Sequence, residues 1–163
     1  MVSDTSRNHF EENTEKGDGP ENMVANCRMI PFHTFGGNGG NLNAIEGGAN
    51  LPFDIRRVYY ITQVPKGVSR GFHSHRRLEQ LLLCVNGSVS IRIKTPFEEE
   101  VISLNDPANG LYIGHMVWRE MFDFSPGAVL LVLASEHYTE EDYIRDHSRY
   151  IEEAVPYFEK EQV

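Results

Sequence analysis

One stretch of the sequence decides the fold, and it reads Gly67-Val68-Ser69-Arg70-Gly71-Phe72-His73-Ser74-His75-Arg76-Arg77-Leu78-Glu79. Because side chains alternate along a β-strand, His73 and His75 on one strand point to the same face. Gly71 adds no bulk to that face, so a ligand could approach the backbone there. Two adjacent imidazoles can bind a metal ion or move protons near neutral pH. With Glu79 following four residues later, we interpret the stretch as a functional site rather than as two structural histidines.

The composition predicts one globular domain in a reducing compartment. The chain has 163 residues, 40% of them hydrophobic, which suits a single domain with a sizeable core. A net charge of −9 argues against a nucleic-acid partner but allows a local basic pocket. Cys27 and Cys84 are too few for a disulfide framework. No secretory leader and no apolar run of about 18 residues is visible, so we expect a cytoplasmic protein with no membrane partner.

Most of the chain is predicted to form β-strands. Residues 1–28 are polar without an apolar period, so we expect a disordered or loosely attached tail before a domain over 29–158. The predicted strands are 42–46, 56–62, 68–75, 79–85, 88–94, 98–104, 111–113, 116–122 and 128–134. The apolar run 79–85 is typical of a strand covered on both faces, and Asn86-Gly87 predicts a two-residue hairpin after it. Short strands at close spacing predict an all-β sandwich or barrel.

The C-terminal part has helical spacing instead. Thr139 precedes Glu140-Glu141-Asp142, which predicts an N-cap followed by an acidic first turn. Apolar residues then recur with a helical period over 143–154, so we expect one or two helices packed on the β-domain.

Many motifs of this chain occur in the order found in one known family. Gly67, His73, His75, Glu79 and Gly87 have the spacing of the first motif of the cupin superfamily. Further motifs are Gly40-Asn41-Leu42, 52–61, Arg70 to His75, Leu78-Glu79-Gln80, Asn86-Gly87-Ser88, 110–113, 117–121, 123–125, 132–135 and 142–145. Over about residues 39–150 the chain resembles the nucleotide-sugar 3,4-ketoisomerases, the dTDP-4-oxo-6-deoxyglucose isomerases with a WxcM-like fold.

The resemblance implies a fold, an assembly and an activity. The fold would be an all-β cupin jelly-roll barrel with a short C-terminal helical segment, in a homodimer that exchanges its N-terminal strand. The activity would be that of an isomerase that moves the ketone of a dTDP-linked 4-oxo-6-deoxy sugar from C4 to C3, with no metal or other cofactor. The product would feed the synthesis of 3-amino-3,6-dideoxy sugars for surface glycans such as lipopolysaccharide.

The candidate catalytic residues are His73, His75 and Tyr59. A ketone moves between neighbouring carbons through an enediol, which needs a base with a pKa near the working pH, and imidazole suits this task. Tyr59 and Arg57 share parity on the strand 56–62, so both can enter one pocket. There Tyr59 would hydrogen-bond a sugar oxygen, and Arg57 would hold the pyrophosphate through paired hydrogen bonds.

Three further substrate-binding candidates are Arg70, Trp118 and Arg119. Strict alternation places Arg70 on the face opposite the histidines, unless the strand bulges there. Trp118 would stack on the base or line the pocket. Arg119 stands where the resembled family commonly has histidine, and it cannot coordinate a cation, so we assign it as an alternative phosphate ligand.

Two other functions remain open at this point. His73, His75 and Glu79 could form the two-histidine, one-carboxylate set of a metal-dependent cupin oxygenase. Alternatively, the substitution at Arg119 would suit a non-catalytic cupin that binds a dTDP-sugar without converting it.

Overall fold

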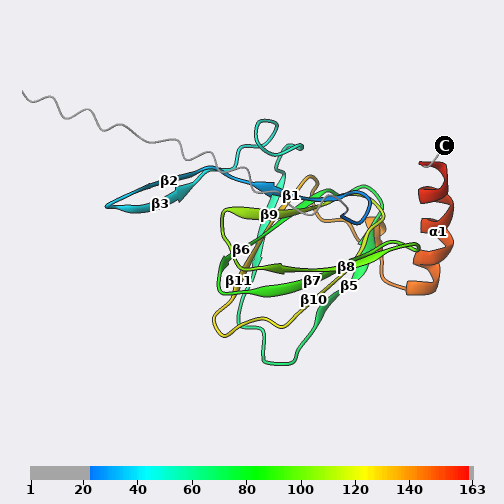
Figure 1. Cartoon of the computed structure of the whole chain (residues 1–163). Helices are drawn as coiled ribbons and strands as arrows, with labels where there is room; N and C mark the ends of the chain where they lie inside the picture. Colours follow the sequence, from blue (N-terminus) through cyan, green and yellow to red (C-terminus); the bar gives the residue numbers. More distant parts are fainter. Residues whose placement is uncertain (1–22, 162–163) are drawn as a thin grey trace, which may run out of the picture.

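The computed structural model describes residues 23–161, which form two five-stranded antiparallel sheets and one C-terminal helix. The sheets have the orders β1-β9-β6-β11-β4 and β12-β5-β10-β7-β8, and they face each other (Figure 1). The strands are β1 (Cys27–Pro31), β2 (Thr34–Gly37), β3 (Gly40–Asn43), β4 (Arg57–Ile61), β5 (Arg70–His75), β6 (Gln80–Asn86), β7 (Val89–Lys94), β8 (Glu99–Leu104), β9 (Asn109–Ile113), β10 (Trp118–Phe122), β11 (Val129–Ala134) and β12 (Tyr143–Ile144). The predicted all-β jelly roll with a short helical end is confirmed.

Alternating apolar residues create the core between the two sheets. In β7, Ile91 and Ile93 are fully buried while the residues between them are partly exposed, which is the period of a strand with one covered face. Leu82 of β6 and Val132 of β11 meet them from the other sheet in one cluster. Burying each such side chain contributes roughly 1.5–3 kcal/mol, so this cluster is a large part of the fold's stability.

Strand β6 is apolar on both faces because both are covered. Its outer face belongs to a second cluster, in which Leu81 and Leu83 pack with Leu51 and Phe53 from the segment 44–55. That segment lies over the first sheet from outside. The predicted double coverage of this strand is therefore confirmed.

The turn after β6 differs from its prediction. Asn86-Gly87 was expected to join two paired strands, yet β6 pairs with β9 and β11 whereas β7 pairs with β8 and β10. The chain therefore crosses from one sheet to the other at this turn, and the predicted hairpin is wrong. Gly87 supplies the sharp change of direction with a φ of 74°.

The C-terminal helix begins later than predicted. Thr139 forms no side-chain cap, and Glu140–Asp142 is a single 3₁₀ turn. Helix α1 (His147–Lys160) starts after Asp146, whose carboxylate accepts a hydrogen bond from the Arg149 backbone N–H. Residues 143–144 do not continue into a helix, because they form β12 and pair with β5. The acidic residues after Thr139 are thus not enough to start a helix here. One face of α1 is buried through Tyr150, Ala154 and Phe158.

The predicted N-terminal tail overlaps the folded domain. Residues 1–22 lie outside the described part of the chain, but Val24 is buried in the core and Cys27 begins β1, which pairs with β9. The strand predicted at 42–46 is β3 at Gly40–Asn43, and it forms a separate two-stranded sheet with β2 that projects from the body (Figure 1). Within residues 23–161, no helix is long and apolar enough to span a bilayer.

Candidate functional site

A cavity of about 370 Å³ opens beside the end of β5 that carries the two histidines. Strands β4 and β5 and the segment after β11 supply its walls. The lining contains three arginines, three tyrosines and one histidine, namely Arg57, Arg70, Arg145, Tyr59, Tyr138, Tyr143 and His73, and Ile61, Gly71 and Met121 complete it. Among residues 23–161, no acidic side chain lines the cavity, so this part of the surface is basic on a chain whose net charge is −9.

A β-bulge in β5 brings Arg70 into this cavity. Arg119 of β10 pairs with His73, but the next residue, Glu120, pairs with Gly71, so Phe72 is the extra residue of β5. Phe72 and Gly71 have φ values of 56° and 93°, which re-aim the chain. A Cβ on Gly71 would approach the Arg119 carbonyl oxygen to 2.8 Å, so only glycine fits there. Arg70 therefore lies on the same face as His73. Without the bulge, strict alternation would have placed it on the opposite face.

The two imidazoles lie together, but they are not equivalent. The ring centroids of His73 and His75 are 4.9 Å apart with the planes nearly perpendicular. His73 lines the cavity, whereas His75 is completely buried behind it, against the Tyr143 ring at 4.2 Å. In the described part of the chain, Nε2 of His75 and Nδ1 of His73 have no hydrogen-bond partner. Each ring therefore has a buried nitrogen whose hydrogen-bonding capacity the described residues do not use.

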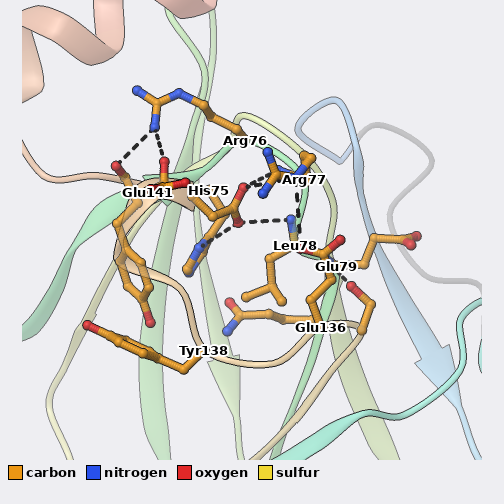
Figure 2. Close-up of polar contacts among 12 residues, drawn as sticks. His75, Arg76, Arg77, Leu78, Glu79, Glu136, Tyr138 and Glu141 are labelled. Atoms are coloured by element: carbon orange, nitrogen blue, oxygen red, sulfur yellow. Dashed lines mark hydrogen bonds and ion pairs between the residues drawn. The ribbon is translucent and has the colours of Figure 1, made fainter.

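Asp142 orients the deeper imidazole. Its Oδ2 lies 3.3 Å from Nδ1 of His75, and its carboxylate accepts the backbone N–H groups of Arg77 at 2.8 Å and Leu78 at 3.2 Å (Figure 2). Burial opposes ionisation of Asp142, but the contacts with His75 and with the Arg77 N–H outweigh it and lower its pKa to about 2. A carboxylate held in this way fixes the tautomer and direction of the imidazole that it contacts.

Both histidines are neutral at physiological pH. Burial lowers the pKa of His73 to about 3, and the positive charge of Arg119 adds to this effect. Burial also lowers the pKa of His75 to about 4, although Asp142 opposes the shift. A neutral imidazole can accept a proton, so both rings are in the form that a base needs, although pKa values this far below neutral make them weaker bases than a free imidazole.

A chain of three polar side chains runs from two buried residues behind the cavity, Arg119 and Gln80, to Tyr59 in its wall. Nη1 of Arg119 donates to Oε1 of Gln80 at 2.9 Å, and Nε2 of Gln80 donates to the Tyr59 hydroxyl at 2.9 Å. Arg119 is 0% exposed and does not line the cavity, so the structure corrects its assignment as a direct phosphate ligand. Gln80 was not singled out from the sequence, because it opens a run of apolar residues.

Trp118 is also placed elsewhere than predicted. Because β10 alternates, Trp118 and Arg119 face opposite sides of the sheet. The Trp118 ring packs against Tyr150 and His147 of α1, with centroids 5.3 Å and 4.9 Å away, and its Nε1 donates to Glu120. Trp118 is therefore a core residue beneath the helix, and the expectation that it contacts substrate is wrong.

The arginines of the cavity differ in how they are held. Cζ of Arg57 lies 5.5 Å from the Tyr59 ring and 5.6 Å from the Tyr138 ring, and its buried Nε has no partner among residues 23–161. Arg145 stacks at 4.2 Å over Tyr143 and pairs with Glu140 through Nε at 2.6 Å. In the described part of the chain, Arg57 thus lies between two aromatic rings and has no acidic partner.

Three cavity residues, Tyr138, Tyr143 and Arg145, were missed as site residues in the sequence. The segment that carries them reaches the cavity through β12, where Tyr143 pairs with His75. The pairing joins residues far apart in the chain, and the 142–145 motif was the only sequence signal for it.

Glu79 does not join the histidines. Its Oε1 accepts a hydrogen bond from the Tyr112 hydroxyl at 2.6 Å, while the next residue, Gln80, points to Arg119 and Tyr59. Neighbouring residues on a strand face opposite ways, so Glu79 cannot complete a metal set with His73 and His75. Within the described residues, no group of three or more histidine, cysteine or acidic side chains is arranged to hold a metal ion.

The chain is similar to known sugar-nucleotide isomerases over most of its length. A family model described as FdtA, WxcM-like, C-terminal matches residues 25–155. A TDP-4-oxo-6-deoxy-alpha-D-glucose-3,4-oxoisomerase from Aneurinibacillus thermoaerophilus is 45% identical over 130 residues, which cover 80% of this chain and 90% of the relative.

Solved structures agree with this similarity. The 3,4-ketoisomerase QdtA from Thermoanaerobacterium thermosaccharolyticum, in complex with TDP, is 57% identical with a TM-score of 0.82, over 83% of this chain and 99% of that one. A histidine-to-asparagine variant of QdtA holds TDP-4-keto-6-deoxyglucose. The TDP-quinovose 3,4-ketoisomerase WlaRB from Campylobacter jejuni is 42% identical with a TM-score of 0.77, over 79% of this chain and 99% of that one. With its jelly roll, its paired imidazoles and this match, the chain belongs to the FdtA family of WxcM-like proteins, whose similar members are TDP-sugar 3,4-ketoisomerases.

Proposed function

We propose that this protein is a sugar 3,4-ketoisomerase that converts a dTDP-4-oxo-6-deoxyhexose into the dTDP-3-oxo-6-deoxyhexose. The observation that carries the proposal is the position of the His73 imidazole in the wall of a cavity lined by three arginines. A base and a set of cations in one cavity suit a substrate with an acidic C–H bond at one end and a pyrophosphate at the other.

The arginines would hold the pyrophosphate. Arg57, Arg70 and Arg145 line the cavity, and Arg57 has no acidic partner there. A guanidinium matches phosphate oxygens with parallel hydrogen bonds, and burial between the Tyr59 and Tyr138 rings reduces the freedom that Arg57 would lose on binding. The relatives that hold TDP and TDP-4-keto-6-deoxyglucose support this choice of ligand.

The reaction moves protons and electron pairs within the sugar, so its overall composition and oxidation level do not change. His73 takes the proton from C3, the C–H electron pair forms the C3–C4 double bond, and the carbonyl π pair moves to the C4 oxygen, which gives the enediolate. In the second half, His75 takes the proton of the C3 hydroxyl and passes it to the C4 oxygen, the ketone forms at C3, and protonated His73 gives its proton to C4. His73 is the better candidate for the carbon base because it lines the cavity.

His75 would serve the sugar oxygens at the deep end of the cavity. Its Nδ1 faces Asp142, while its Nε2 has no partner in the described part of the chain. This nitrogen can exchange a proton with an oxygen of the enediol, and Asp142 would stabilise the imidazolium that forms. The Tyr59 hydroxyl, which lines the same cavity, would hydrogen-bond the sugar oxygen that develops charge.

We also propose the homodimer and the cytoplasmic location. Within residues 23–161, the β2–β3 hairpin pairs with no other strand and exposes Phe35 and Leu42, which are 48% and 59% accessible. The outer face of the edge strand β4 exposes Val58 and Tyr60. A second copy that exchanges this N-terminal arm would cover such surfaces. The unpaired thiols Cys27 and Cys84 support a reducing compartment.

Incubation with dTDP-4-oxo-6-deoxyglucose in D₂O, followed by NMR of the sugar ring, tests the activity. We expect loss of the C4 ketone, appearance of a C3 ketone, and incorporation of solvent deuterium at C4 of the product, the carbon that gains a proton. Tight binding with an unchanged ring would contradict the proposal and select the non-catalytic sugar-binding protein.

A further inference from the structure

The hydrogen-bond chain behind the cavity has a direction that the chemistry of its members determines. Arg119 and Gln80 are 0% and 1% exposed, and their side chains meet at 2.9 Å. A guanidinium can only donate hydrogen bonds. Gln80 must therefore turn its carbonyl oxygen to Arg119, and its amide NH₂ is left facing Tyr59, from which it lies 2.9 Å away.

The amide in turn determines where the Tyr59 proton points. The Tyr59 oxygen accepts from Gln80, so its single hydrogen must point elsewhere. Among residues 23–161, no acceptor takes that hydrogen, and Tyr59 lines the cavity. The hydroxyl is thus presented to the cavity as a donor.

We infer that Gln80 is a positioning residue, oriented by Arg119, that holds the Tyr59 hydroxyl as a hydrogen-bond donor toward a sugar oxygen of the bound substrate. This inference rests on the proposed function and deepens it. A donor aimed at the oxygen where negative charge develops lowers the barrier, and because it is preorganised it needs no rearrangement during the reaction. Arg119 acts without touching substrate.

The exchange Gln80→Glu reverses this polarity with almost no change in shape. Both carboxylate oxygens only accept, so one would take the Arg119 hydrogen bond and the other would take the Tyr59 proton, which turns away from the cavity. Arg119 next to it keeps the introduced carboxyl ionised. A purely structural role would predict a stable and active variant, because a buried guanidinium gains an opposite charge.

We expect kcat of Gln80→Glu to fall by about 10- to 100-fold, with KM changed less than about threefold and no decrease in the melting temperature. The matched control is Glu79→Gln, the reverse exchange one residue away, whose side chain contacts Tyr112 outside the cavity. Its kcat should stay within about twofold of the parent protein, as expected for a change outside the site.

The same exchange in the Tyr59→Phe background isolates the effect. Without the hydroxyl, Gln80→Glu should change kcat by less than about twofold, because the two residues act as one unit. An equal loss in both backgrounds, or Gln80→Glu activity within twofold of the parent protein, would overturn the inference.

A second readout does not depend on turnover. In protein labelled with ¹³C at the tyrosine ring carbon that bears oxygen, the Tyr59 signal is the one missing in Tyr59→Phe. We expect Gln80→Glu to move this signal toward the phenolate position, since the hydroxyl then donates to a carboxylate. An unmoved signal would overturn the inference whether or not the protein turns over the sugar, whereas a moved signal with no turnover in the parent protein would contradict only the proposed function.

Discussion

Two neighbouring residues of β10, Glu120 and Arg119, are placed in opposite electrostatic surroundings. On the outer face, Glu120 accepts hydrogen bonds from Arg92 at 2.9 Å and Trp118 at 3.2 Å, with the Lys94 ammonium 3.5 Å away. On the inner face, Arg119 has one hydrogen bond, to neutral Gln80, and its Nε and Nη2 have no partner in the described part of the chain.

The difference shows where this fold tolerates charges that lack a neighbouring opposite charge. Charges on the outer face are compensated locally and contribute modestly to stability. Within residues 23–161, the inner face keeps a buried cation without a carboxylate partner, next to one buried and one partly buried imidazole, which costs stability. Among residues 23–161, most of the buried side-chain atoms without a hydrogen-bond partner belong to Arg57, His73, His75 and Arg119, close to the positive φ values of Gly71 and Phe72. Such concentration is typical of a functional site on a well-packed scaffold.

The largest loss of activity is expected from replacing His73, the proposed base on the inner face. His73→Asn should lower kcat by about 10³-fold, within the range for loss of a general base, while the protein stays folded because His73 is only partly buried. NMR of the sugar product measures the rate, and circular dichroism checks the fold. Turnover within tenfold of the parent protein would show that the cavity imidazole is not the base.

The inner face should also make the protein sensitive to acid. His73 and His75 have pKa values of about 3 and 4 when folded, so between the unfolded value near 6.5 and these values the unfolded chain binds more protons. Stability is fully present above about pH 6.5 and should fall by up to about 1.4 kcal/mol per pH unit for each histidine below it. Urea titrations from pH 7.5 to 4 measure this slope.

Measuring the same pH dependence of stability in His73→Asn tests whether the histidines cause it. One histidine fewer should give a shallower loss of stability over the same pH range. An identical slope in the variant would mean that other groups, such as the acidic side chains, cause the acid sensitivity.

Replacing Arg119 tests how much its charge contributes to keeping the two histidines neutral. The charge of Arg119 contributes to the lowered pKa of both histidines, so Arg119→Met should move both pKa values upward. The acid limb of kcat/KM, which reports groups of the free enzyme, should shift to higher pH. A limb that stays in place would show that burial alone keeps the imidazoles neutral.

The smallest effect is expected on the outer face. Glu120→Gln weakens its pairs with Arg92 and Lys94, which are partly exposed, so the free energy of unfolding should fall by only about 1 kcal/mol or less. Its kcat should remain within twofold of the parent protein. A loss of activity comparable with that of His73→Asn would remove the distinction between the two faces.

Local patterns were enough to predict much of this molecule. The strands from 56 onward match the observed β4 to β11 to within two residues at each end, because alternation and turn residues report whether a face is buried. The alternation of side chains along a strand predicted that His73 and His75 share a face. It predicted the same for Arg57 and Tyr59.

Long-range pairing could not be predicted in the same way. Asn86-Gly87 has the composition of a hairpin, yet whether the next strand joins the same sheet depends on the whole topology. The segment that carries Asp142 reaches the site because β12 pairs with β5, and its acidic residues resemble a helix start when considered alone. The bulge at Phe72, which moves Arg70 into the cavity, likewise depends on register with β10.

NMR titration of the imidazole rings tests the central claim, which is that the inner face holds its paired histidines neutral. Assigned through His73→Asn and His75→Asn, neither ring should titrate between about pH 5 and 8, where a solvent-exposed histidine changes charge. A midpoint near 6.5 for either ring would contradict the account, because it would mean that the ring experiences neither the burial nor the uncompensated arginine on which the proposed chemistry depends.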